Sequence, residues 1–299
     1  MINDQNSLEE DLSLEIHQSL PFGRTLFSRG MTAIAFTLTA IAVLPLFAIL
    51  FEILRQGLPQ LSPEVFVSLP ASMGEENVPN GFANAIIGTL MMVGIACLLS
   101  IPFGVMTGIF LSEFSASSAI SDYVRFIIKI LSSVPSIVVG VFAYSVVVIQ
   151  FGFSAVAGGF ALAVIMLPIV ALSTEEALKL VPVPHRLASA ALGGGRFQTT
   201  FRIVIISALP AITTGVLLAV ARAAGETAPL ILTALSSQFW PEGFLNPTPS
   251  LSVLIYNYAQ SPFKEQNKMA WTASLVLIGI VLLSSIVSRQ ITNKRLKNR

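Results

Sequence analysis

Apolar residues along this chain occur in long runs without any charge. Uncharged runs cover residues 31–51, 82–112, 130–173, 203–221 and 271–288. A helix needs about 20 apolar residues to cross the hydrocarbon core of a membrane, so the run 130–173 is long enough for two. The pattern therefore predicts six spans, at about residues 30–52, 82–112, 127–149, 153–173, 203–235 and 270–290.

Each span is expected to be helical, because lipid offers no hydrogen-bond partner to a free backbone group. The sequence Gln-Phe-Gly-Phe at residues 150–153 is the best point for a hairpin between the third and fourth spans. Residues 1–26 form a polar tail that we expect to be disordered, and residues 27–299 form one transmembrane domain. The acidic start of the chain is unlike the basic start of a secretory signal peptide, so we expect the first span to be retained. The predicted fold class is an all-α polytopic membrane protein.

Composition agrees with lipid as the main solvent. Mean hydropathy is +0.79 and 11% of residues are charged, against roughly a quarter in soluble domains. The single cysteine, Cys97, has no partner for an internal disulfide. The two histidines, His17 and His185, have no other ligand at metal-binding spacing. We therefore expect no metal, no cofactor and no nucleic-acid partner.

The basic residues indicate which side of the membrane each loop faces. Cytoplasmic loops carry an excess of lysine and arginine. With the even-numbered loops and both tails on one side, that side holds thirteen of the 17 basic residues and the other holds three, Arg55, Lys264 and Lys268. We therefore expect both termini to be cytoplasmic, in a protein of the bacterial plasma membrane, which is the inner membrane where there are two.

The longest cytoplasmic loop, residues 174–202, is predicted to hold a short helix. The sequence Val-Pro-Val-Pro at residues 181–184 cannot continue a helix. Good helix formers follow, until three glycines at 193–195 end the helix. Such a helix is marginal alone, and a partner groove would stabilise it. The residues proposed for this contact are Pro184, His185, Arg186, Leu187, Ala188, Ser189, Ala190, Leu192 and Gly193.

The same loop carries no catalytic or nucleotide-binding motif. A phosphate-binding loop needs Gly-Lys-Ser/Thr after its glycines, whereas Arg196, Phe197 and Gln198 follow here. We predict no catalytic residue, and any ATP hydrolysis belongs to a separate subunit. Glu175 and Glu176, at the start of the loop, are expected to form a solvated face.

Arg222 and Glu226 are the one pair of opposite charges inside an apolar run. A charge in the bilayer interior costs at least about 2.5–3.5 kcal/mol, so such residues face a pathway or each other. One interpretation is a polar translocation pathway or gate, where Arg222 helps an anion past. The other is structural, with the two charges neutralising each other and joining two helices. Gly225 and Pro229 favour a helix break at this point.

The loop resembles that of the permease subunits of ATP-binding-cassette (ABC) importers. Their motif reads Glu-Ala-Ala, three residues, Gly, nine residues, Ile, one residue, Leu-Pro. With Gly193 as anchor, Ile203 falls on the isoleucine, and Ala188 and Ser189 fall on the alanine pair. The sequence departs from the motif at Leu187, which replaces the glutamate, and at residues 205–206, which are Ile-Ile.

Three further segments are similar to the PstA-type phosphate permease family. They are residues 133–140, residues 255–259 and, most specifically, residues 218–230 with the run Gly-Glu-Thr-Ala-Pro-Leu. The resemblance implies a MetI-like type I importer fold with a coupling helix at residues 184–192. It also implies a PstC-type second permease in a heterodimer, two PstB-type ATPases in the cytoplasm and a PstS-type phosphate-binding protein outside. In the family, the arginine and glutamate at the positions of Arg222 and Glu226 are the charged residues associated with transport.

The expected function is that of a permease subunit that forms half of the pathway of an ABC importer for inorganic phosphate. A permease for another oxyanion, such as molybdate, sulfate or phosphonate, stays open, because nothing in the chemistry of Arg222 selects phosphate. An ion-coupled secondary transporter that works without ATP is the third hypothesis.

Overall fold

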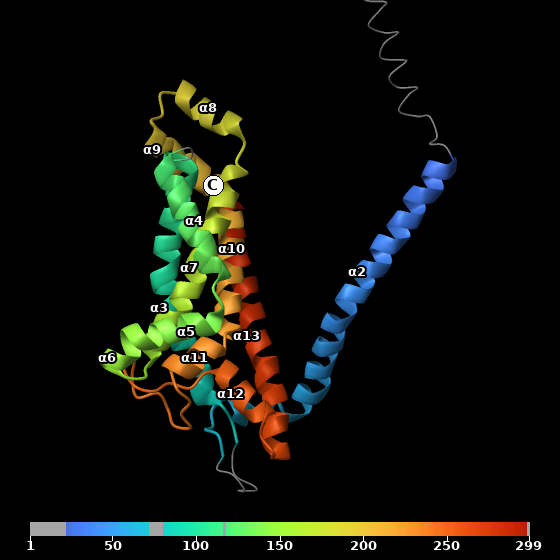
Figure 1. The fold of residues 1–299 in the computed structure, drawn as a ribbon, viewed down its shortest axis with the longest axis vertical. Coiled ribbons are helices and arrows are strands. Elements are labelled where there is room, and N and C mark those ends of the chain that lie inside the picture. Colours follow the sequence, from blue (N-terminus) through green and yellow to red (C-terminus); the bar gives the residue numbers. More distant parts are fainter. Residues whose placement is uncertain (1–21, 72–79, 116–117, 298–299) are drawn as a thin grey trace, which may run out of the picture. The chain divides into compact units, whose positions relative to one another are not determined.

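The computed structural model describes residues 22–71, 80–115 and 118–297. Every regular element in these ranges is helical (Figure 1). The chain divides into two units, Met1–Glu52 and Ile53–Arg299, which are described separately. The first unit holds most of α2 (Phe22–Gly57), whose side chains there are almost all exposed. Residues 1–21 of the predicted tail lie outside the described residues, and residues 22–26 are already helical.

The second unit begins with the end of α2 and is built around two long helices. Short 3-10 turns (Leu58–Gln60 and Pro63–Phe66) lead to α3 (Ala83–Ile109), which continues into a π-helical turn, η3 (Phe110–Phe114). Helix α7 (Ala155–Lys179) packs along α3 and is the most buried of the long helices. The largest cluster of buried apolar residues in the described chain lies mainly between these two helices and α10.

Close packing of α3 on α7 follows from a stripe of small residues. Small buried residues on α3 recur every four positions, at Ala96, Ser100, Gly104 and Gly108. A Cβ atom on Gly108 would lie 2.6 Å from Thr174 Cβ, and one on Gly104 would lie 2.8 Å from Val170 Cβ. In lipid, helices associate through such small residues because there is little hydrophobic driving force between them.

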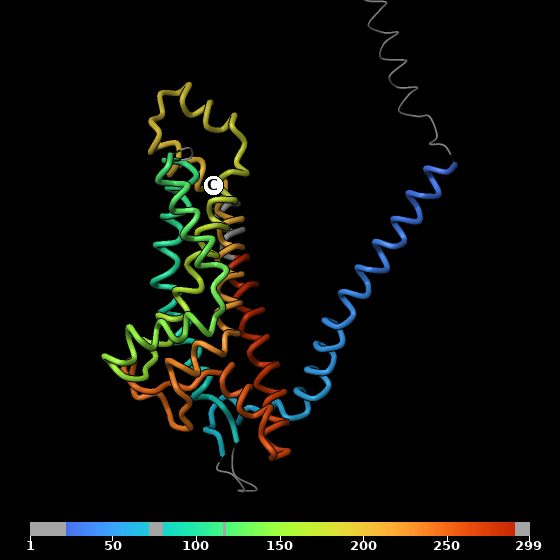
Figure 2. The backbone as a smooth tube through the Cα atoms, viewed as in Figure 1, coloured from blue at the N-terminus to red at the C-terminus, as the bar shows by residue number. Residues whose placement is uncertain are grey.

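The third predicted span is bent, a feature that the uncharged run 130–173 does not indicate. Helix α4 (Ala119–Ser133) and the following α5 (Ser136–Ala143) meet at an angle of 101° (Figure 2). The chain then continues through a π-helical turn (Tyr144–Val148) and α6 (Ile149–Phe151) to the left-handed residue Gly152. The cause of the bend is Pro135, which has no N–H and holds Val134 in an extended conformation with ψ 129°.

The C-terminal half of the unit carries both predicted functional segments. Its elements are α8 (Val183–Ala191), α9 (Arg196–Thr199), the π-helical turn η5 (Thr200–Val204), α10 (Ile205–Gly225), α11 (Ala228–Thr233), α12 (Leu251–Ala259) and α13 (Lys264–Lys297). Helices α8 and α9 lie at one end of this unit, and α11 and α12 lie at the other (Figure 1).

Five helices of the described chain are long and apolar enough to cross a membrane, and there are six if the bent pair of α4 with α5–α6 is counted as one span. The fold is therefore the six-span, all-helical one that the apolar runs predict. The fifth span is interrupted at residues 226–227, so α10 and α11 are separate helices within the predicted segment 203–235.

Candidate functional site

Helix α8 is the short helix expected in the long loop. It begins after Pro182 and ends in a Schellman motif, where Gly193 N–H donates to Ala190 and Gly194 N–H donates to Ser189. Gly193 has a φ of +78°, the left-handed conformation that such an end requires. The Ser189 hydroxyl lies 2.7 Å from that of Thr199, which joins α8 to α9.

Large apolar side chains on and beside α8 are left exposed. They are Leu180, Val183, Leu187, Leu192 and Phe197, and Leu192 is 91% exposed. Arg186 points the other way, toward the protein. A short helix with one face held and its apolar side chains uncovered has the form of a segment that docks into a partner groove.

Arg186 connects α8 to two other parts of the protein. Its guanidinium donates to both carboxylate oxygens of Glu113, at 2.7 and 3.4 Å. The same group donates to the backbone carbonyls of Leu178 and Val181, at the end of α7. Arg196 also contacts this turn, because it donates to the Glu113 backbone carbonyl and lies over the Phe114 ring.

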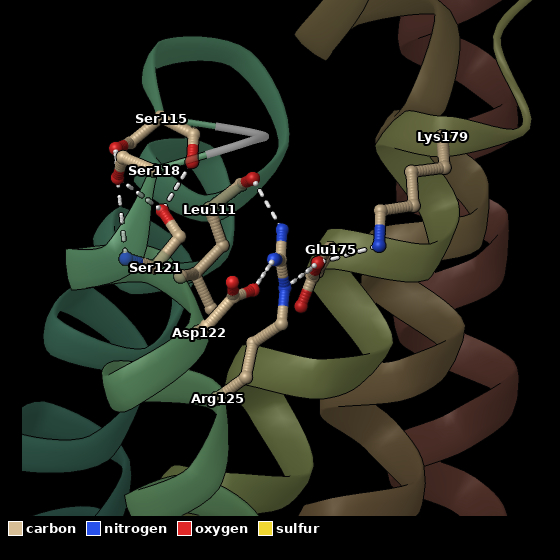
Figure 3. Close-up of polar contacts among 8 residues, drawn as sticks. All are labelled: Leu111, Ser115, Ser118, Ser121, Asp122, Arg125, Glu175 and Lys179. Atoms are coloured by element: carbon tan, nitrogen blue, oxygen red, sulfur yellow. Dashed lines mark hydrogen bonds and ion pairs between the residues drawn. The ribbon is translucent and has the colours of Figure 1, made fainter.

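A second ion-pair cluster lies nearby and joins η3, α4 and α7 (Figure 3). Arg125 on α4 donates to the Glu175 carboxylate at 2.8 Å and to the Leu111 carbonyl at 3.0 Å. Lys179 donates to the same carboxylate at 2.5 Å, and Asp122 accepts from Arg125 at 3.2 Å. In the same view, Ser118 caps the start of α4 by accepting from the Ser121 N–H.

This cluster corrects the expectation of a solvated face at Glu175. Its side chain is 4% exposed, whereas Glu176 is exposed as expected. Burial of Glu175 is tolerated because two cations pair with its carboxylate. The pairing with Lys179 follows i,i+4 spacing and was visible in the sequence, but the pairing with Arg125 depends on how α4 crosses α7.

Arg222 and Glu226 also meet, at the opposite end of α10. The Arg222 Nε lies 3.4 Å from the Glu226 carboxylate. Helix α10 stops between them at Gly225, and Glu226 is extended, with ψ 130°. Its backbone carbonyl accepts a hydrogen bond from the Ser252 hydroxyl of α12. The 21 residues of α10 correspond to about 30 Å of helix, so this pair and the α8 segment are separate sites.

The α11–α12 end also holds a cavity of about 320 Å³ with no charged residue in its lining. Asn84, which is fully buried on α3, fixes one wall by donating to the carbonyls of Ser237 and Phe239. Asn257 and Gln266 line the other side. No group of His, Cys, Asp and Glu side chains able to hold a metal ion occurs in the ranges that the structure describes.

Long apolar helices, a closely packed helix pair at the centre and the short helix α8 at one end define the class as a multi-pass helical membrane protein. Comparison with known proteins narrows this class. The chain belongs to the family described as "Binding-protein-dependent transport system inner membrane component", whose model matches residues 100–297.

Relatives in this family cover most of the chain. It is 40% identical over 279 residues to a protein of Haemophilus influenzae named "Phosphate transport system permease protein PstA", covering 92% of this chain and 98% of the relative. A Yersinia pestis protein of the same name is 41% identical, with 83% of each chain covered. A protein of Methanocaldococcus jannaschii, named a probable PstA permease, is 38% identical over 82% of this chain and 86% of its own.

Solved structures share the fold at low sequence identity. A bacterial ABC transporter involved in the import of alginate aligns with a TM-score of 0.63 and 14% identity, covering 90% of this chain and 98% of that one. An inward-facing MetNI methionine ABC transporter aligns with a TM-score of 0.55 and 19% identity, covering 71% and 92%. These structures support the MetI-like importer fold.

Proposed function

We propose that this chain is a transmembrane permease subunit of an ABC importer for inorganic phosphate. The observation that carries the proposal is its identity of about 40%, over nearly the whole length, to permeases named for phosphate transport. The chain forms half of the translocation pathway, and a PstC-type permease forms the other half. Two PstB-type ATPases and a PstS-type binding protein complete the complex.

The α8 segment is the coupling helix in this proposal. Its exposed apolar side chains, such as Leu187 and Leu192, enter a groove on an ATPase. The bias of basic residues supports a cytoplasmic position for this loop and for both termini. ATP binding closes the two ATPases, and the movement of α8 tilts the spans between inward-open and outward-open states.

The pair at the end of α10 belongs to the pathway. The guanidinium of Arg222 is exposed and presents several N–H donors, which suits the oxygens of a phosphate. Glu226 limits how tightly the anion is held, because a pathway that binds its ion too strongly does not release it. The binding protein delivers phosphate at the α11–α12 end, and the anion passes Arg222 between the two permeases.

The proposal is tested by isolating the complex from membranes and identifying the subunits that accompany this chain. The complex is then placed in liposomes with the binding protein, and uptake of labelled phosphate is measured with and without ATP on the side of the ATPases. We expect uptake that needs both ATP and the binding protein, and that excess sulfate or molybdate does not reduce.

Two results would overturn parts of this proposal. Preferential uptake of sulfate, molybdate or a phosphonate would show that phosphate is not the substrate, although the chain would still belong to an ABC importer. Uptake by the purified chain alone, driven by an ion gradient and indifferent to ATP, would show a secondary transporter instead.

A further inference from the structure

We propose that Glu113 is the positioning residue through which movement of α8 reaches the membrane-spanning helices. The inference rests on the proposed function, because it assumes that α8 is driven by an ATPase. Glu113 lies in η3, directly after α3, and its side chain is only 9% exposed. It is 73 residues away from Arg186 in the sequence.

The first connection runs from the start of α8. Arg186 holds the Glu113 carboxylate with two N–H groups and the carbonyls of Leu178 and Val181 with others. Bonds between a guanidinium and a carboxylate are strong and directional. A displacement of α8 therefore pulls on the end of α3 and on the end of α7 together.

The second connection runs from the segment after α8 to the same residue. Arg196 donates to the Glu113 backbone carbonyl at 2.9 Å and lies 5.5 Å from the centre of the Phe114 ring. A hydrogen bond between the hydroxyls of Ser189 and Thr199 also joins α8 to α9. Residues 183–199 make polar side-chain contacts with the α3–η3 segment. Among the described residues, all of these contacts are with Glu113.

A third arginine carries the connection onward. Arg125 donates to the carbonyl of Leu111, two residues before Glu113, and to the Glu175 carboxylate on α7 (Figure 3). The π-helical turn η3 is therefore held by Arg186, Arg196 and Arg125, which come from α8, α9 and α4. π-Helical turns are rare and occur frequently at functional sites.

The test uses the whole complex with its ATPases and binding protein. Glu113→Gln keeps the size of the side chain but removes its charge, and Arg186→Lys keeps the charge but loses the fork of donors. Arg202→Gln is the control, since Arg202 is an exposed arginine in the same loop region with no contact of this kind. Assembly, basal ATP hydrolysis, hydrolysis stimulated by the binding protein, and phosphate uptake are measured for each.

For Glu113→Gln we expect intact assembly and basal ATP hydrolysis, with a fall of about tenfold in stimulated hydrolysis and in phosphate taken up per ATP. Arg186→Lys should show a smaller fall, and Arg202→Gln none. A double variant, Glu113→Gln with Arg186→Gln, should be no worse than the more affected of its two component single variants, Glu113→Gln and Arg186→Gln, because both changes break the same connection.

Stimulated hydrolysis and uptake at the level of the unmodified complex in Glu113→Gln would overturn the inference. So would additive losses in the double variant. If Glu113→Gln fails to assemble, the decision rests on Arg186→Lys, and unchanged coupling there overturns the inference as well. Failure of the proposed function is a different result, in which the unmodified complex shows no ATP-dependent phosphate uptake.

Discussion

Arg222 and Glu226 face each other at the end of α10 but are unequally exposed. The Arg222 side chain is 57% exposed and that of Glu226 is 15% exposed, with 3.4 Å between Nε and the carboxylate. Glu226 is further fixed by its position at the helix end and by the bond from Ser252 to its carbonyl. The arginine is therefore the more accessible member of the pair.

Replacing Arg222 with glutamine is expected to abolish most phosphate uptake while the complex still assembles. A hydrogen bond to a charged group contributes about 1.5–3 kcal/mol, which corresponds to a loss of at least about tenfold in rate. Uptake is measured in liposomes at fixed amounts of complex, with assembly followed by co-purification. Arg289→Gln, at an exposed arginine on α13, is the control. Normal uptake by Arg222→Gln would remove this residue from the pathway.

The apolar runs predict the main helices because the membrane imposes a minimum length on each span. The short helix was also predictable, since Pro182 and Gly193 stand at its two ends. Contacts between segments that are distant in the sequence were not predictable. Arg186 and Glu113 each look like ordinary loop charges, and their pairing depends on where α3 ends relative to α8. The bend at Pro135 had a local signal, but its angle depends on the packing of α4 and α5.

Glu175→Ala is expected to lower the stability of the permease in detergent. It removes the shared partner of Arg125 and Lys179 and leaves the largely buried guanidinium of Arg125 without its nearest carboxylate. We expect a cost of about 2–3 kcal/mol, measured as a lower temperature of thermal unfolding.

Asp122→Asn is the matched control for Glu175→Ala. It removes a second carboxylate from the same arginine, but Asp122 is 77% exposed, so the cost should stay under about 1 kcal/mol. Equal losses for the two variants would contradict the assignment of Glu175 as the central member of the cluster.

Gly108→Val is expected to separate α3 from α7. The added side chain meets Thr174 and the Ala171 carbonyl, which belong to the facing helix and cannot move far. Overpacking of this kind costs about 1–3 kcal/mol, which thermal unfolding in detergent would detect. Gly94→Ala on the exposed side of the same helix meets nothing within 4 Å and should leave stability unchanged or slightly higher. A neutral Gly108→Val would show that the two helices are not closely packed there.

Gly193→Ala is expected to loosen the end of α8 without disturbing the spans. Gly193 holds a φ of +78°, where an L-residue with a Cβ is strained by roughly 1–2 kcal/mol. The variant should therefore lose the bonds from Gly193 and Gly194 to α8, seen as faster amide hydrogen exchange at residues 188–194. Uptake per ATP should fall a few-fold, about the factor that 1 kcal/mol represents. Gly195→Ala is the matched control, because Gly195 has a φ of −69° and open space around it. Equal exchange rates in the two variants would show that the left-handed residue does not hold the helix end.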